Sequence, residues 1–82
     1  MKYETEIRHF IVTEVIADGS AADLGIADPL ISSGRVDSLG LVQILLQIQQ
    51  MFGVDLMSVG TPVDFDSVGA LAAAVRRNKG EE

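Results

Sequence analysis

The sequence predicts an all-α fold: a four-helix bundle of three main helices and one short helix, with a long ordered loop between helices 1 and 2. Three observations predict it. Apolar residues recur every three or four positions along three segments, as on one face of a helix. Cap residues and glycines mark the ends of these segments. No segment shows the alternation that is typical of strands. The 82 residues are sufficient for one domain, which we assign to residues 1–82.

The first helix is expected over residues 3–16. Its apolar face consists of Tyr3, Ile7, Phe10, Ile11 and Val15. Gly19 is expected to end this helix as its C-cap. His9 lies beside the polar stripe and, as the only histidine of the chain, has no partner for a metal site or a catalytic triad. We therefore expect His9 to face solvent or to be a hydrogen-bonded structural histidine.

Residues 17–37 are predicted to form the long loop, because glycine, serine and proline recur along them. Loops of this length are uncommon in compact domains and often functional. Five apolar residues of the loop are available to hold it against the bundle: Leu24, Ile26, Leu30, Ile31 and Val36. We therefore expect an ordered loop that delivers its last residues to a fixed place.

The second main helix is expected to run from about Ser38 to Phe52 and to end at Gly53. The short helix is expected to open at Gly60-Thr61-Pro62, with Thr61 as its cap.

The last helix is expected to begin at a cap formed by Asp66 or Ser67. It ends in basic residues, which suit a helix C-terminus. These are Arg76, Arg77 and Lys79. Residues 80–82 are expected to form a frayed tail.

The charge of the chain argues against several classes of partner. The formal net charge is −6, and residues 18–66 contain seven aspartates but only one basic residue, Arg35. Such a segment repels nucleic acid and anionic membranes, so basic protein surfaces are the expected partners. The alternative is that the acidity serves solubility alone. No apolar run approaches the ~18–20 residues that span a bilayer, and the acidic start is unlike a targeting peptide. We expect a cytoplasmic monomer.

The middle helix carries two apolar stripes. The expected core face consists of Leu41, Ile44, Leu45, Ile48, Met51 and Phe52. A second stripe of Leu39, Val42 and Leu46 lies roughly 150–200° away and is bordered by Gln43. Because so small a domain has one core, we expect this second stripe to be a partly exposed docking surface. The alternative is that the loop over residues 17–37 covers it.

Ser38 follows Asp37 at the start of this helix. The helix dipole and the unpaired N–H groups favour a phosphate ester there by roughly 0.3–1 kcal/mol. No histidine or lysine close in the sequence could activate Ser38, so we expect it to be modified rather than to act as a nucleophile. Asp66-Ser67 repeats the motif, and there helix capping is the better explanation. The distinguishing features of Ser38 are the loop before it and the two-faced helix after it.

The chain resembles acyl and peptidyl carrier proteins over essentially its whole length. The resemblance rests on Asp28-Pro29-Leu30-Ile31, Gly34-Arg35-Val36-Asp37-Ser38-Leu39, Phe52-Gly53-Val54-Asp55, and the later run from Thr61 to Val68 with Leu71. It implies a four-helix fold with phosphopantetheine attached to a serine by a phosphopantetheinyl transferase that uses coenzyme A.

In this sequence Ser38 matches the modified serine, and Asp37 matches the acid that helps to position the magnesium of the transferase. The residues that match or border the partner-docking positions are Leu39, Val42, Gln43 and Leu46. The resemblance implies no metal site of the chain's own. It also implies that the cargo lies partly between helices, shielded by Ile44, Leu45 and Leu71.

The function implied is that of a non-catalytic acyl carrier. It holds a fatty, polyketide or aminoacyl group as a thioester and presents it to acyl-loading and acyl-modifying enzymes. The chain has no cysteine, so the thiol must come from the prosthetic group. Carriers of primary fatty-acid biosynthesis have a strongly acidic recognition helix. Here the corresponding positions are Gly40, Gln43, Gln49 and Gln50. This difference favours a carrier of a specialised pathway.

One alternative is a helical protein-interaction module without a prosthetic group, in which Ser38 is only a helix cap. An enzyme is not expected, because the sequence offers neither an acid–base pair nor a metal cluster.

Overall fold

The computed structural model describes residues 2–16, 18–19, 21–58 and 65–80. Within them lie three α-helices: α1 (Lys2–Phe10), α2 (Ser38–Phe52) and α3 (Val68–Lys79). A π-helical segment, η1 (Ile11–Val15), continues α1, and a short 3-10 helix, η2 (Leu56–Ser58), follows α2. The described residues contain no strand. The all-α prediction is confirmed, whereas the short helix expected at Gly60-Thr61-Pro62 falls outside the described residues.

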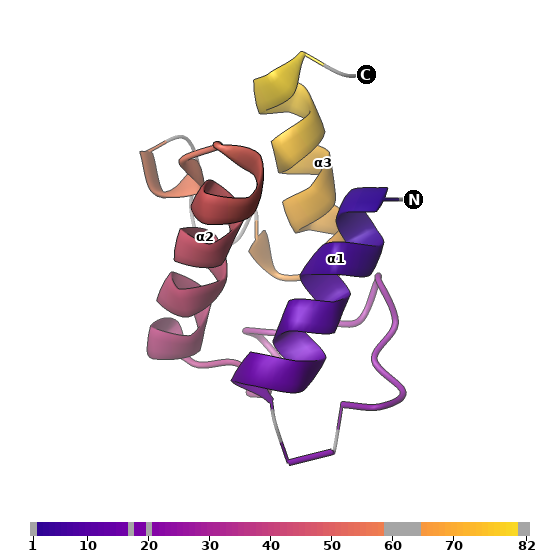
Figure 1. Cartoon of the computed structure of the whole chain (residues 1–82). Coiled ribbons are helices and arrows are strands. Elements are labelled where there is room, and N and C mark those ends of the chain that lie inside the picture. The colour runs from indigo at the N-terminus through magenta and orange to yellow at the C-terminus, as the bar shows by residue number, and fades with distance from the viewer. Residues whose placement is uncertain (1, 17, 20, 59–64, 81–82) are drawn as a thin grey trace.

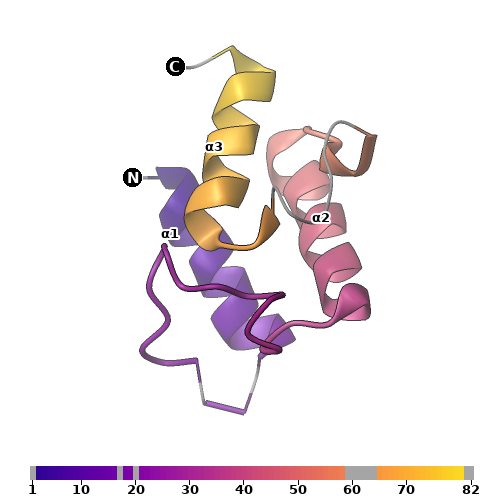
Figure 2. The same ribbon diagram turned by 180° about the vertical axis from the view of Figure 1, so that it is seen from behind.

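The three α-helices surround one apolar core, and the long loop closes one end of the bundle. α1 runs in the opposite direction to α2 and α3 and packs against both (Figures 1 and 2). The loop between η1 and α2 lies at the end where α2 begins. Side chains from all three helices, η2 and the loop belong to the same buried cluster. The start of α2 is therefore held between the loop and the bundle.

The first helix departs from the prediction over its last turn. The Ile16 N–H donates to the Ile11 carbonyl at 2.8 Å, one residue further back than in an α-helix. This wider turn buries both Ile11 and Ile16 and leaves Val15 half-buried beside the start of α2. Gly19, expected as the C-cap, has a positive φ of 86° but lies in a turn beyond the helix, whose C-cap is Ile16. That prediction was wrong.

The bounds predicted for α2 are confirmed. Gly53 adopts the left-handed conformation at φ 73°, and its N–H donates to the Gln49 carbonyl. The expected core face is buried at Leu41, Ile44, Leu45 and Ile48 and half-buried at Met51 and Phe52.

α3 is capped by Ser67, one of the two caps predicted, and charged side chains join it to the other helices. Arg76 donates to Glu4 of α1 at 2.6 Å, and Lys79 donates to the Phe52 carbonyl at 3.1 Å. Gly80, predicted to be part of a frayed tail, closes α3 in the left-handed conformation. The rest of that predicted tail, residues 81–82, falls outside the described residues. Among the residues described, no helix combines the length and the apolar character needed to cross a bilayer.

Candidate functional site

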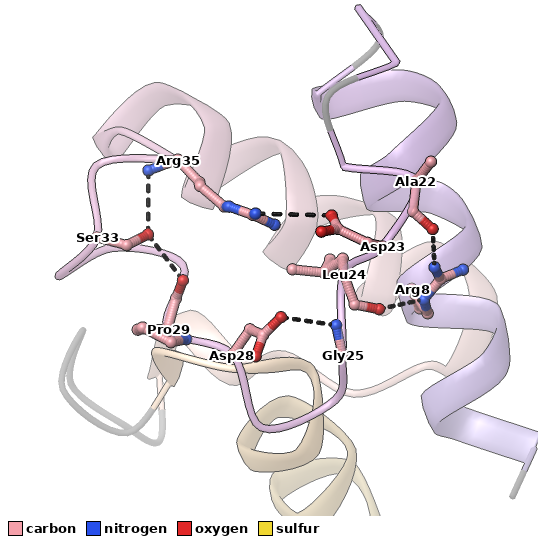
Figure 3. A network of polar contacts seen from close by, with 9 residues as sticks. All are labelled: Arg8, Ala22, Asp23, Leu24, Gly25, Asp28, Pro29, Ser33 and Arg35. Atoms are coloured by element: carbon pink, nitrogen blue, oxygen red, sulfur yellow. Dashed lines mark hydrogen bonds and ion pairs between the residues drawn. The ribbon is translucent and has the colours of Figure 1, made fainter.

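The first half of the long loop is tied down by polar contacts with α1 and within itself (Figure 3). Arg8 reaches out of α1 and donates to the carbonyls of Leu24, at 2.6 Å, and Ala22, at 2.8 Å. The Gly25 N–H donates to the Asp28 carboxylate at 2.8 Å, which closes a tight turn. Because these bonds satisfy backbone groups that lie outside helices and sheets, they hold residues 22–28 in place.

The second half of the loop approaches α2 through a further turn. The Ser33 hydroxyl donates to the Pro29 carbonyl at 2.7 Å and accepts from the Arg35 N–H at 3.3 Å (Figure 3). Arg35 also lies 3.8 Å from the Asp23 carboxylate, an exposed pair of little energetic weight.

Apolar side chains hold the loop from beneath, largely as predicted. Leu24, Leu30 and Val36 are buried, and Ile31 is half-buried. Ile26, which we expected to pack in the same way, is 49% exposed. The expectation of an anchored loop is confirmed, and only the part assigned to Ile26 was wrong.

Asp66 connects the start of α3 to the loop. Its carboxylate accepts hydrogen bonds from the Ile31 N–H at 2.6 Å, the Ser32 N–H at 3.0 Å and the Ser32 hydroxyl at 2.7 Å. Its carbonyl accepts from the Leu30 N–H at 2.6 Å. The bond from the Ser32 hydroxyl is the main reason that the pKa of Asp66 is below its ordinary value. From the sequence, Asp66 is expected only as a possible helix cap, since no local pattern indicates a partner more than 30 residues away.

The loop ends at Asp37, which caps α2. The Asp37 backbone is extended, and its carboxylate oxygen Oδ1 accepts from the Gly40 N–H at 2.8 Å. Ser38 is the first helical residue and is exposed. Within the described part of the chain, its hydroxyl takes part in no hydrogen bond. The capping role that one alternative gave to Ser38 is therefore wrong, because Asp37 is the cap.

The second Asp-Ser pair is placed differently on its helix. Ser67 is the cap of α3, and its hydroxyl oxygen accepts from the Ala70 N–H at 3.1 Å. Asp66 lies before the cap and binds the loop instead. Relative to the first residue of its helix, the second Asp-Ser pair thus lies one residue earlier than the first pair. One serine hydroxyl is engaged, and the other faces solvent without a partner among the described residues.

Gly40 lets the loop and η1 approach the start of α2 closely. A Cβ atom there would lie 3.0 Å from Val36 Cγ1, 3.2 Å from Val15 Cγ1 and 3.4 Å from Asp37 Oδ1. Gly40 is buried accordingly. From the sequence we noted that this position differs from the aspartate of acidic recognition helices. The structure gives a physical reason, because a Cβ atom here would require the Val36 and Val15 side chains to shift by a few tenths of an ångström.

The second apolar stripe of α2 is exposed, as predicted, and the alternative of a loop covering it is wrong. Leu39 is 74% exposed, Val42 42% and Leu46 44%. Gln43 beside them is exposed as well. The stripe begins next to Ser38, and Val42 follows Ser38 by one helical turn. The candidate site thus joins an exposed hydroxyl to an uncharged, partly apolar helix face.

Several hollows border α2 in the described part of the molecule. One, of about 320 Å³, adjoins the end of the loop and is lined by Val15, residues 34–37, Leu39, Gly40 and Gln43. Another, of about 550 Å³, lies between α1 with η1 and the far end of α2, and its lining includes His9. His9 is exposed, as predicted. The described residues contain no group of three His, Cys, Asp or Glu residues that could hold a metal ion.

Comparison with known families relates most of the chain to a described domain. The family model described as "Phosphopantetheine attachment site" matches residues 11–75, which include η1, the loop, α2 and most of α3. No match was found among curated proteins or among solved structures. Domains of the matched family carry a covalently attached phosphopantetheine and are not catalytic. They interact with modifying enzymes and with a phosphopantetheinyl transferase.

The exposed, uncapped hydroxyl at a helix start fits such a group, since an attachment point must be open to the transferase. The match extends over most of the chain and confirms the resemblance to acyl and peptidyl carrier proteins. This chain belongs to the phosphopantetheine attachment site family and is a carrier protein, not an enzyme.

Proposed function

We propose that Ser38 is the attachment point and that the chain carries an acyl group of a specialised biosynthetic pathway. The prosthetic group supplies the thiol on which a fatty, polyketide or aminoacyl group is held as a thioester. The chain itself positions this arm and presents it to partner enzymes. Tethering raises the effective concentration of the cargo at each partner's active site.

The observation that carries the proposal is the one-residue offset between the two Asp-Ser pairs. Asp37 caps α2 and thereby leaves the Ser38 hydroxyl exposed. Ser67 uses its hydroxyl as the cap of α3 and is half-buried. Of these two serines, only Ser38 offers an oxygen that a transferase can reach without breaking a helix cap.

The start of α2 suits a phosphodiester for electrostatic reasons. The first backbone N–H groups of a helix lack intrahelical acceptors and carry partial positive charge. Asp37 engages one of them through Oδ1, and the carboxylate is exposed. We assign to Asp37 a second task during attachment, which is to help hold the magnesium ion of the transferase.

The docking surface we propose consists of Leu39, Val42, Gln43 and Leu46. All four side chains are exposed on the helix that begins at Ser38. α2 contains no charged residue from Ser38 to Phe52. Partner recognition along this helix then depends on apolar contact and glutamine hydrogen bonds rather than on salt-screened attraction. This property supports a dedicated carrier over one of primary fatty-acid biosynthesis.

The test is the intact mass of the protein after incubation with coenzyme A, Mg²⁺ and a broad-specificity phosphopantetheinyl transferase. The wild-type chain should gain the mass of one phosphopantetheine. Ser38→Ala should abolish the gain, and Ser67→Ala, the matched control, should retain it. A wild-type chain that gains no mass, or a Ser38→Ala variant that still gains it, would contradict the proposal. The first result would favour an interaction module without a prosthetic group.

The pathway is tested separately, by mass spectrometry of the protein purified from its native host with its cargo attached. A fatty-acyl chain that matches the intermediates of membrane-lipid synthesis would contradict the specialised role. Any such result leaves the assignment of Ser38 intact.

A further inference from the structure

The loop before Ser38 is held at two separate points, by Asp66 before the cap of α3 and by the first turn of α3 itself. Asp66 engages Leu30, Ile31 and Ser32 through its carbonyl and its carboxylate. One turn further along, the Gly69 N–H donates to the Ile26 carbonyl at 2.8 Å. A Cβ atom at Gly69 would lie 3.2 Å from that carbonyl oxygen, so the two backbones approach closely. The start of α3 thus serves as a fixed support for the loop.

The contacts of Asp66 are continuous with the start of α2. Leu30, whose N–H donates to the Asp66 carbonyl, accepts through its own carbonyl from the Val36 N–H at 3.0 Å. Val36 is buried and directly precedes Asp37 and Ser38. Two hydrogen-bonded steps therefore connect Asp66 to the residue before the cap of α2.

The Asp66 carboxylate does more than close a local turn. It accepts three hydrogen bonds, two from backbone N–H groups and one from a hydroxyl, all from residues 34 or 35 positions away in the sequence. Since Ser67 caps α3, this carboxylate is not needed for that cap. Its contacts are directed to the segment that presents the attachment serine.

We propose that Asp66 is a positioning residue for phosphopantetheine attachment, which holds the loop over residues 30–36 so that Ser38 is presented to the transferase in one conformation. The inference rests on the proposed role of Ser38. Without these bonds the loop samples other conformations, and only a fraction of the folded carrier is competent to bind. The apparent affinity for the transferase falls by that fraction, while turnover at saturation is retained.

The chain provides a matched control in Asp55. Its carboxylate accepts from the Met57 N–H at 3.1 Å and from the Ser58 hydroxyl at 2.8 Å, so it engages the same two kinds of donor, with one N–H fewer than Asp66. These contacts lie in the turn after α2, at the opposite end of that helix from Ser38. Asp55→Ala removes a similar number of hydrogen bonds without touching the loop.

The experiment measures transfer from coenzyme A to the full chain as a function of carrier concentration, with circular dichroism showing that each variant is fully folded. Asp66→Ala should raise the KM for the carrier by roughly tenfold with little change in kcat. Asp66→Asn keeps an oxygen that can accept from Ile31 and Ser32, so its KM should lie much closer to that of the wild type. Asp55→Ala should keep the wild-type KM. Amide hydrogen exchange should rise at Val36 in Asp66→Ala and not in Asp55→Ala.

A wild-type KM in folded Asp66→Ala overturns the inference, and so does an equal rise in Asp55→Ala. Where Asp66→Ala does not fold, Ser32→Ala, which removes one bond to the carboxylate, should still raise KM, and an unchanged KM overturns the inference. The mass gain of the wild-type chain distinguishes a failure of this inference from a failure of the proposed function. If Ser38 is modified equally well in every variant, only the positioning role of Asp66 is contradicted. If Ser38 is not modified even in the wild-type chain, the proposed function is contradicted.

Discussion

Asp37 and Ser67 serve as the caps of α2 and α3, although they occupy different positions of the same Asp-Ser motif. Asp37 Oδ1 accepts from the Gly40 N–H at 2.8 Å, and Ser67 Oγ accepts from the Ala70 N–H at 3.1 Å. Because the cap falls on the acid in one pair and on the hydroxyl in the other, only Ser38 keeps its hydroxyl available. A shift of one residue therefore separates a candidate modification site from a structural cap.

The two tasks assigned to Asp37 are separable by mutation. Asparagine caps a helix as well as aspartate does, so Asp37→Asn should keep nearly the wild-type stability but slow phosphopantetheine transfer, because it lacks the charge for magnesium. Asp37→Ala should slow transfer and also lose about 1 kcal/mol of stability. Urea unfolding and transfer kinetics on the same samples check both. Wild-type transfer by Asp37→Asn would show that the acid acts only as a cap.

The exposed stripe of α2 should tolerate a charge without unfolding. Leu46 is 44% exposed, so Leu46→Asp should change stability by no more than about 0.5–1 kcal/mol. The variant should accept phosphopantetheine on Ser38 but react poorly with partner enzymes, since a charge is introduced into an apolar contact.

The neighbouring Leu45 provides the control, because it is buried and Leu45→Asp should unfold the chain. Circular dichroism and partner-dependent loading or release of the cargo measure the two effects. An unfolded Leu46→Asp variant would mean that the stripe belongs to the core.

Gly40 should not accept the aspartate that acidic recognition helices carry at this position. The new Cβ would lie 3.0 Å from Val36 Cγ1, and the carboxylate would sit next to the Asp37 carboxylate. Gly40→Asp should therefore cost about 1–3 kcal/mol, in spite of the better helix propensity of aspartate. Gln43→Asp, on the exposed face of the same helix, should cost far less. Urea midpoints compare the two variants, and a fully stable Gly40→Asp would contradict the close packing.

Acid should weaken the contact between α1 and α3. The hydrogen bond from Arg76 holds the pKa of Glu4 below its ordinary value of 4.5. A carboxyl group whose pKa is lower in the folded state than in the unfolded state stabilises the fold. For Glu4 this contribution is fully present above pH 4.5 and is lost as the pH falls through the pKa of the folded state. Stability should therefore decline below about pH 4.5. Because the pKa of Asp66 is also lowered, this carboxylate should add a loss of stability once the pH falls below its ordinary value of 3.8.

Glu4→Gln tests the contribution of the Glu4 carboxylate to stability. This variant should be less stable than the wild type near neutral pH, and the difference should shrink as the pH falls below 4.5. Urea midpoints across this range provide the measurement. A difference that is independent of pH would show that the carboxylate of Glu4 contributes through packing rather than through its charge.

Much of the fold follows from local patterns. The spacing of apolar residues along α2, together with Gly53 at its end, predicts that helix correctly, because both signals act within one or two turns. The motif around Ser38 and the order of the segments identify the family, since they depend on the identity and spacing of residues. The sequence also reveals the second stripe of α2, but it leaves open whether the loop covers it.

The remaining features depend on contacts between distant segments. The wide turn of η1 lets Ile11 and Ile16 share the core, and helical periodicity alone does not predict it. The sequence could not say which member of each Asp-Ser pair becomes the cap, because both residue types cap helices well. The partner of Asp66 lies 34 residues away, and no local signal points to it. The sequence by itself determined the all-α class, the bounds of α2, the family and the candidate serine. The tertiary structure decided which hydroxyl stays free and what holds it in place, because burial and long-range hydrogen bonds exist only once the segments have packed.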